Sequence, residues 1–599
     1  MERRTALLPT ASDGASAPSK SMNHDAPRTI WNRNDIPLHV AAILILMIVQ
    51  LALLGYGYGL PIHSELVPHY EQARNPELFT RDWRIQTNTD PAGLRWGFIS
   101  LHNTIFRPFP GSLPLFELLA FLVIGTLKFS AFYAIAFQLF RDWKVGVLSG
   151  ILVVVFKNHL NDFDIFLRGP VITSYFAETF MLWAIVLFSR KPFLFALVAG
   201  FTTYIHLATG SQMILAYGLV NLLPLQIDSR WLMRQVSLGT GFFIGSLPIW
   251  IHLPDLLDRA VTAGDYPYAT ELLIMRAPWH FDYFRSEQAL LEFACYVGLF
   301  FYLAWPRSEA EHQFVRRLFT AMLILVVLNI LLSNPIIRWD FAINFDSARL
   351  AQYLIVFALM YFSDALLRTA EKIPSSWKPL ILIPGIGILL FMLDPKILSG
   401  SLIITDQIYS SFYLFGSGIV FFVLLRWLQL RVTHEDKSPI YAQFFIGVVL
   451  LGSVLSFAFH KPIYIWGDQS PEPHDEMALW IEASTPIDAV FVVNPFDERF
   501  KHLAERATIV EWRFLPYPFY EEWLNRVFDV LGIQLKESES PLPYIENLRS
   551  YEYWDENYLA MSELRAMMLH EKYDASYLLI NDSINLDFPV VHQCCGLIL

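Results

Sequence analysis

The feature that most limits the fold of this chain is an apolar run without charged residues, from Pro37 to Tyr58. As a helix, roughly 20 residues span about 30 Å, the thickness of the hydrocarbon core of a bilayer. Similar runs recur along most of the chain, and 54% of its 599 residues are hydrophobic while only 17% are charged. Ordinary soluble domains are less apolar than this. The sequence therefore predicts a polytopic α-helical membrane protein.

The apolar runs predict about 13 transmembrane helices between residues 37 and 460. Three runs, at 145–156, 193–205 and 211–225, are shorter than a full crossing. Short crossings are tolerated where neighbouring helices or a water-filled recess cover their ends. We therefore expect an aqueous recess in one face of the bundle.

The distribution of Lys and Arg between the spans predicts the orientation. Links on the side of the N-terminus hold 15 basic residues, whereas the opposite links hold about seven. We expect a cytoplasmic N-terminus in the inner membrane. Two long polar loops then lie outside, the first polar loop at 59–112 and the second polar loop at 253–288. An odd number of crossings places the C-terminus outside as well.

The two ends of the chain differ from the membrane frame. Residues 1–36 are polar and rich in Ser, Pro and Ala, which predicts a disordered cytoplasmic tail. Residues 461–599, the C-terminal region, hold 24 acidic and 10 basic residues, a balance that disfavours nucleic acid as a partner. Short apolar strands at 489–495, 508–512 and 577–581 alternate with helical stretches. This alternation predicts an extracytoplasmic α/β domain.

The first polar loop is rich in charged and aromatic residues and holds the candidate catalytic groups. Glu65 and His63 follow the first span closely enough to meet a lipid headgroup, and Asp82 lies further along. A carboxylate at such a position can remove the proton of an acceptor hydroxyl. The alternative is that these residues cap local helices, with no part in chemistry.

Cationic residues near the expected outer ends of the spans form a candidate substrate-binding set. Guanidinium groups recognise phosphate through paired hydrogen bonds, although Arg at helix ends also extends towards the interface without a ligand. A histidine at such a place can equally be a core residue that bonds to the backbone. The set consists of Arg168, His206, Arg276, His280 and Arg349.

Two features bear on cofactors and on ion coupling. Asp162 and Asp164 could give a divalent cation two oxygens, and no other cofactor is indicated. Lys128 and Glu178 lie within spans, where a charge is costly and marks either a pair or a function. Their depths, counted from the ends of the runs, differ by about 10 Å at ~1.5 Å per residue, so a direct pair is expected only if a side chain extends along its helix.

The layout resembles that of the GT-C superfamily of membrane glycosyltransferases: a large loop after the first span, short spans, and a C-terminal α/β domain. Several stretches resemble a family of uncharacterised bacterial membrane proteins with the same layout. They are IHSELVPHY, NPELFTRDW, YIHLATG, RAPWHF, WIEASTPIDAVFVVNPFDERF and ERATIVEWR. The GT-C resemblance implies a polyprenyl-phosphate sugar as donor, Glu65 or Asp82 as base, and Arg349 or Arg276 as the phosphate clamp. The paired acids typical of the GT-C first loop are absent here.

The leading hypothesis is therefore a GT-C-like glycosyltransferase that moves a sugar from a lipid-phosphate donor to an acceptor on the outer face of the membrane. Two alternatives stay open. A non-catalytic assembly or binding protein would use the acidic C-terminal region as its contact surface. A transporter would use Lys128 and Glu178 as coupling charges, and would be expected to show an internal repeat, which the spans do not. The sugar, the acceptor and the oligomeric state are not defined by the sequence.

Overall fold

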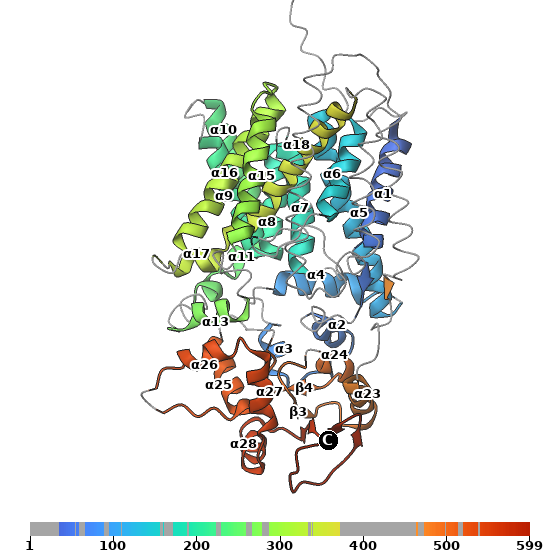
Figure 1. The fold of residues 1–599 in the computed structure, drawn as a ribbon, viewed down its shortest axis with the longest axis vertical. Coiled ribbons are helices and arrows are strands. Elements are labelled where there is room, and N and C mark those ends of the chain that lie inside the picture. Colours follow the sequence, from blue (N-terminus) through green and yellow to red (C-terminus); the bar gives the residue numbers. More distant parts are fainter. Residues whose placement is uncertain are drawn as a thin grey trace, which may run out of the picture.

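The computed structural model places most of the chain in a helical bundle with an α/β part below it (Figure 1). A layer of short helices lies between the two parts. The residues that the structure describes are 35–53, 55–58, 66–88, 95–109, 111–155, 160, 172–188, 191–222, 229–258, 266–277, 287–333, 337, 339–371, 463–464, 473–497, 499–512, 519–536 and 539–599.

Helices occupy the first ten apolar runs, close to the predicted bounds. Three of them, Leu113–Phe140, Ala310–Leu332 and Ser347–Thr369, are long and apolar enough to cross a membrane. The chain is therefore a multi-pass membrane protein. The predicted spans eleven to thirteen, at 380–459, fall outside the described residues, as does most of the predicted tail. The bundle consists of α1 (Ile36–Leu53), α5 (Leu113–Phe140), α6 (Trp143–Val155), α7 (Thr173–Phe188), α8 (Pro192–Ile205), α9 (Leu207–Leu222), α10 (Ser229–Gly245), α11 (Leu247–Ile251), α15 (Glu287–Ala304), α16 (Ala310–Leu332) and α18 (Ala351–Glu371).

The predicted seventh span, 231–252, is broken in the structure. α10 ends at Gly245, and α11 begins at Leu247 after Ser246. Pro248 lies in the first turn of α11, where a proline is tolerated because the first helical N–H groups have no intrahelical partner. Inside one continuous helix the same proline would clash with the preceding turn.

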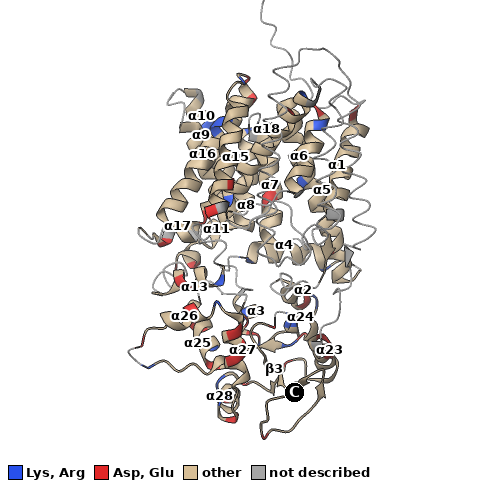
Figure 2. Ribbon diagram, in the orientation of Figure 1, with Lys and Arg blue, Asp and Glu red and all other residues tan. Residues whose placement is uncertain are grey.

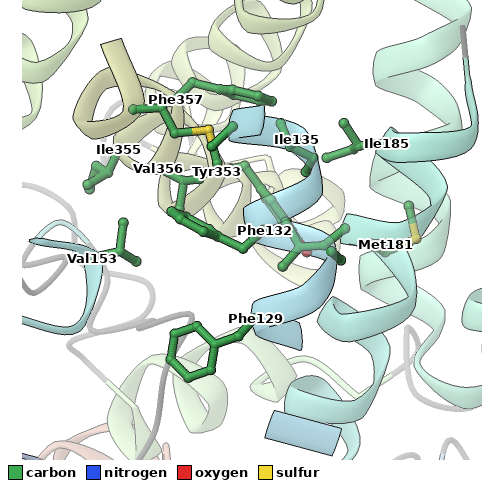
Figure 3. Packing of buried hydrophobic residues seen from close by; sticks show 14 of the residues in the cluster. Phe129, Phe132, Ile135, Val153, Met181, Ile185, Tyr353, Ile355, Val356 and Phe357 are labelled. Atoms are coloured by element: carbon green, nitrogen blue, oxygen red, sulfur yellow. The ribbon is translucent and has the colours of Figure 1, made fainter. Parts of the chain in front are cut away.

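The helix α18 forms the centre of the bundle. In the span Ser347–Thr369, which includes most of α18, 89% of the apolar stretch is buried within the protein, compared with 39% in α16. Its side chains, such as Tyr353 and Phe357, pack against Phe132 of α5 and Met181 of α7 in one continuous core (Figure 3). α18 is apolar on all sides because other helices surround it, whereas α16 keeps an exposed apolar face of the kind that lipid would cover.

A buried polar cluster in the bundle joins four helices. Lys128 Nζ of α5 lies 2.7 Å from Glu178 Oε2 of α7, and Gln352 of α18 donates to Glu178 Oε1 at 3.2 Å. Lys128 also lies 3.8 Å from the ring centre of Tyr175, whose hydroxyl accepts from Gln50 of α1. The direct pair, which was expected only if a side chain extends along its helix, is therefore present. The charges balance within the cluster.

The layer below the bundle comes from the two polar loops. The first polar loop supplies α2 (Val67–Arg74), α3 (Trp83–Asn88) and α4 (Trp96–Phe106), and the second supplies α13 (Ala269–Arg276). Leu272 and Met275 of α13 belong to the core of the C-terminal region. Charged residues are sparse within the bundle and frequent in this layer and below it (Figure 2).

The C-terminal region has the predicted α/β character. The strands β3 (Val490–Val492), β4 (Ala507–Thr508) and β5 (Tyr577–Leu578) form a parallel sheet in the order β4-β3-β5. Successive side chains of a strand face opposite sides, so Val490 and Val492 join one core while Phe491 joins another. A second, antiparallel sheet has the order β6-β8-β7, from β6 (Ile580–Asn581), β7 (Gln593–Cys594) and β8 (Leu597–Ile598).

Helices cover the parallel sheet on both faces. α23 (Pro473–Ser484) and α24 (Phe500–Ala504) pack on the face of Phe491. The opposite face is covered by α25 (Tyr520–Leu531) and α27 (Tyr551–Leu559). In α25 the buried residues recur at helical spacing, and the helix ends at Gly532, whose φ of +71° is one that glycine adopts without strain. α26 (Leu542–Asn547) and α28 (Glu563–Tyr573) complete this region.

A short parallel strand pair ties the two ends of the membrane frame together. β1 (Tyr56–Gly57), directly after α1, pairs with β2 (Ile463–Tyr464), where the C-terminal region begins. The first polar loop and the C-terminal region therefore start from neighbouring points.

Candidate anion-binding site

Three arginines from three separate segments lie close together beneath the bundle. Arg95 precedes α4, Arg276 ends α13, and Arg349 lies in the short helix η3 (Ser347–Leu350) before α18. Burial, together with the charges of Arg276 and Arg349, lowers the pKa of Arg95. The charges of Arg276 and Arg349 both act on that of Arg95, and a group of cations of this kind favours an anion, although Asp346 pairs with Arg349. We call these three residues the arginine cluster.

Arg349 is held by a turn that two bundle helices fix. Its Nε donates to Asp346 Oδ2 at 2.5 Å, which orients the guanidinium. Asp346 has a φ of +46°, and Gln212 of α9 donates to its carbonyl at 2.9 Å. Asn329 of α16 accepts from the N–H of Ala348 at 3.2 Å. The left-handed turn is therefore stabilised by side chains of the rigid bundle.

Arg95 is positioned by close packing of α4 on the end of α8. A Cβ added to Gly97 would lie 2.5 Å from the carbonyl oxygen of Tyr204, so this contact requires a glycine. Trp96 lies against the rings of Tyr204 and His252, at centroid distances of 6.1 and 5.7 Å. The start of α4 is thus fixed against the bundle on both sides of the glycine.

His206 lies at the corner between α8 and α9, within electrostatic range of Arg349 and Arg95. Its Nδ1 accepts from the backbone N–H of Thr209 at 3.3 Å, so in the neutral ring Nε2 carries the proton. The structure therefore brings together three of the five predicted cationic residues, namely His206, Arg276 and Arg349. Their role in binding a substrate stays a prediction.

Asp82, a predicted catalytic candidate, lies in a different place. Its Oδ2 is 2.7 Å from Lys501 Nζ, and Lys501 is 3.1 Å from Glu511 Oε2, which also meets Arg84 at 2.6 Å. All four side chains are buried. We call them the four-charge cluster; it joins the first polar loop to the C-terminal region.

The environment of Asp82 keeps it ionised. Burial alone would raise its pKa, but the charge and hydrogen bond of Lys501 and the backbone N–H groups of Ile85 and Thr508 outweigh burial, so the pKa of Asp82 is lowered. A carboxylate in this state is a weak base. The geometry of Asp82 is that of a structural ion pair, and its catalytic role stays a prediction.

The remaining predicted site residues lie outside the described part of the chain. These are His63, Glu65, Asp162, Asp164, Arg168 and His280. Among the described residues, no group of three or more His, Cys, Asp or Glu is arranged to hold a metal ion. The prediction of a divalent cation therefore stays open.

The sequence prediction missed Arg95, Arg84, Lys501 and Glu511. Arg95 is one of five arginines in the first polar loop, and its only distinguishing signal is its position just before the apolar helix that starts at Trp96. Arg84 lies in FTRDWR and Glu511 in IVEWR, two motifs that resemble each other in composition but gave no sign of a contact.

One part of the chain matches the model of a known protein family. Residues 472–530 match the family described as Domain of unknown function (DUF6798). This segment spans α23, β3, α24, β4 and most of α25, and it includes Lys501 and Glu511. The sequence-based resemblance to an uncharacterised family is thereby confirmed. No curated protein matches the chain.

Two solved membrane proteins are similar to the whole chain in structure. ArnT from Cupriavidus metallidurans, solved with undecaprenyl phosphate, matches with a TM-score of 0.47 and 11% identity, over 95% of this chain and 98% of ArnT. The archaeal oligosaccharyltransferase AglB from Archaeoglobus fulgidus, solved with an inhibitory peptide and a dolichol-phosphate, matches with a TM-score of 0.40 and 11% identity. That match covers 92% of this chain and 70% of AglB.

Proposed function

We propose that the arginine cluster binds the phosphate of a membrane lipid, and that the protein is a glycosyltransferase of the GT-C type. In this proposal a sugar moves from a polyprenyl-phosphate donor to an acceptor on the outer face of the inner membrane. The N-terminus is cytoplasmic, and the C-terminal region lies in the periplasm.

The observation that carries the proposal is the convergence of Arg95, Arg276 and Arg349 next to the ends of the membrane helices. Guanidinium groups held near one another repel, and a phosphate anion relieves this repulsion beyond what Asp346 already offsets at Arg349. Planar guanidinium groups also match the geometry of phosphate oxygens. A phosphate on a lipid chain reaches this level of the protein directly from the bilayer.

The same arrangement suits transfer of a sugar. The acceptor hydroxyl oxygen attacks the anomeric carbon, a new C–O bond forms, and the bond from that carbon to the phosphate oxygen breaks with both electrons leaving on the phosphate. The anomeric configuration is inverted. The arginines stabilise the phosphate charge that develops as this bond breaks, and the acceptor proton passes to a general base.

The candidate bases differ in what their surroundings allow. Asp82 is held as a carboxylate by Lys501 and by two backbone N–H groups, which weakens it as a base. Within the proposal we therefore assign the base to Glu65, with His63 beside it. Loss of Asp82 should then reduce stability first and activity only as a consequence.

Binding of undecaprenyl phosphate to the protein in lipid nanodiscs, followed by native mass spectrometry, tests the first half of the proposal. Alanine at Arg95, Arg276 or Arg349 should each weaken binding by roughly 10- to 100-fold, because a hydrogen bond to a charged group contributes about 1.5–3 kcal/mol. The matched control is Arg368→Ala, an exposed arginine of α18 that pairs with Asp364. Equal binding by all four variants would overturn the assignment.

Release of polyprenyl phosphate from polyprenyl-phosphate sugars tests the second half, because this product forms whatever the acceptor is. Membranes with the wild-type protein should release it, and those with Glu65→Gln should not. Tight binding of undecaprenyl phosphate without release in membranes of the native host would leave a lipid-binding protein and refute the transferase.

One observation favours the alternative of a non-catalytic binding protein. Asp82, which lies in the loop expected to hold the acids, serves as a buried link to the C-terminal region. The transporter alternative has less support, since Lys128 and Glu178 neutralise each other within a packed bundle. In a binding protein, the variants of the arginine cluster would leave its association with partners unchanged.

A further inference from the structure

A second site lies in the first polar loop, apart from the arginine cluster. A cavity of about 480 Å³ opens between α2, the turn that follows it, and α4. Small-molecule sites in proteins fall in the range of about 300–1,000 Å³. Its lining residues are His69, Gln72, Ala73, Pro76, Thr80, Gln86, Ile99 and Asn103.

Five of the eight lining residues are polar, three are apolar, and none carries a formal charge. None of the eight residues is Asp, Glu, Lys or Arg, and burial together with the charge of Arg84 lowers the pKa of His69 to about 3, so its ring is neutral at pH 7. Amides, one hydroxyl and one imidazole offer both donors and acceptors. A charged ligand would find no counter-charge in this wall.

Several polar groups of the wall are held in place before any ligand binds. The side-chain N–H groups of Gln72 and Gln86 donate to the carbonyls of Leu78 and Phe79, each at 3.1 Å. Asn103 Oδ1 is buried and accepts no hydrogen bond from any described residue. A buried acceptor without a donor costs free energy, which a ligand hydroxyl could recover.

The cavity and the arginine cluster lie along the same helix. Arg95 precedes α4, Ile99 lies about one turn further on, and Asn103 about two turns, which corresponds to roughly 6 and 12 Å at ~1.5 Å per residue. A ligand in the cavity therefore lies within the length of a sugar residue or two of a phosphate at Arg95.

From these observations we infer that the cavity binds a neutral polyhydroxylated group, and that it holds the acceptor of the transfer reaction as a carbohydrate or similar polyol. The acceptor role rests on the proposed function, whereas binding of the polyol does not. Hydroxyl groups satisfy Asn103 and the amides, while Ala73, Pro76 and Ile99 supply apolar contacts for the C–H faces of a sugar ring.

Saturation-transfer NMR on the full-length protein in nanodiscs tests this inference with methyl glycosides of glucose, galactose, mannose and N-acetylglucosamine as probes. At least one probe should receive saturation. Ala73→Trp, which fills the cavity, should abolish the signal, and Asn103→Leu should weaken binding at least several-fold. Thr104→Val is the matched control, because Thr104 is an exposed neighbour on α4 outside the lining.

The two proposals fail in different ways. Asn103→Leu should keep full binding of undecaprenyl phosphate while its glycoside binding weakens, and Arg349→Ala should keep glycoside binding while its lipid binding weakens. Absence of saturation for every probe, or saturation that Ala73→Trp leaves unchanged, would refute the cavity as a polyol site even if the arginine cluster binds lipid. If the wild-type protein binds a glycoside in the cavity and releases polyprenyl phosphate from a polyprenyl-phosphate sugar, but transfers no sugar to that glycoside, the role of the cavity as acceptor site is refuted.

Discussion

Replacing Lys501 by Met should loosen the C-terminal region from the first polar loop. Lys501 is 1% exposed and lies 2.7 Å from Asp82 and 3.1 Å from Glu511. Methionine fills a similar volume, but it leaves two buried carboxylates with Arg84 as the remaining cation of the four-charge cluster. Removal of one partner from a buried ion pair costs about 3–5 kcal/mol, and we expect a loss in this range.

Pulse proteolysis of the purified protein across a urea titration measures this loss as a shift of the midpoint for cleavage in the C-terminal region. The matched control is Lys572→Met, which removes an exposed pair with Asp529 at 2.6 Å. An exposed pair contributes about 0–1 kcal/mol, so the control midpoint should move little. Equal shifts in the two variants would show that the four-charge cluster contributes no more than a surface pair.

The pH dependence gives this prediction a second readout. In the wild type the pKa of Asp82 is lowered, so its contribution to stability is present above the ordinary carboxyl pKa and is lost only as the pH falls through the lowered value. Without Lys501, burial is no longer outweighed, and Asp82 gains a proton at higher pH. The defect of Lys501→Met should therefore be larger at pH 8 than at pH 5. A defect that grows as the pH falls would contradict this account.

Three further predictions concern single positions. Lys128→Met leaves Glu178 buried without its cation, at a cost of about 3–5 kcal/mol. The midpoint of thermal aggregation, monitored by size-exclusion chromatography in detergent, should therefore fall. The double variant Lys128→Met with Glu178→Leu should recover most of this loss. Gly97→Ala should destabilise the protein by about 1–3 kcal/mol and weaken binding of the lipid phosphate. The control is Gly218→Ala, where the added Cβ would meet open space, and it should be neutral or stabilising in the same thermal assay. Burial and neighbouring carboxylates raise the pKa of Glu505 from 4.5 to about 7, so its ionised form costs stability above pH 7 and the cost disappears as the pH falls towards 4.5. Glu505→Gln should therefore stabilise at pH 8, by less than about 1 kcal/mol because the side chain is partly exposed, and should have a much smaller effect at pH 5; an equal effect at both values would refute this pKa.

Much of the fold could be predicted from the sequence because apolar length and strand composition are local signals. The second span was predicted at residues 113–140, and α5 has these bounds. The strand in AVFVVNP appears as β3 and is buried, as its continuous apolar run predicts. The break at Ser246 was missed because apolar residues lie on both sides of Ser246 and Pro248.

Contacts between distant segments could not be predicted, since no local pattern encodes them. Lys128 and Glu178 lie on two different helices, and their contact depends on how α5 packs against α7. The first polar loop holds four other arginines, and the sequence distinguishes Arg95 from them only by its position directly before α4. The predicted Arg276 and Arg349 were found from their positions near span ends, which is a local signal, but their proximity to Arg95 required the structure.

The four-charge cluster can form only late in the synthesis of the chain. Arg84 and Glu511 are 427 positions apart in the chain, and a ribosome that adds ~5–20 residues per second needs roughly 20–85 s to reach the second after the first. During this interval the first polar loop has been synthesised but lacks the C-terminal partners of Asp82 and Arg84. The loop must therefore wait in a solvated form, open to chaperones and proteases, until the last quarter of the protein is translated. A nascent chain stalled before Lys501 would expose this loop for as long as it persists.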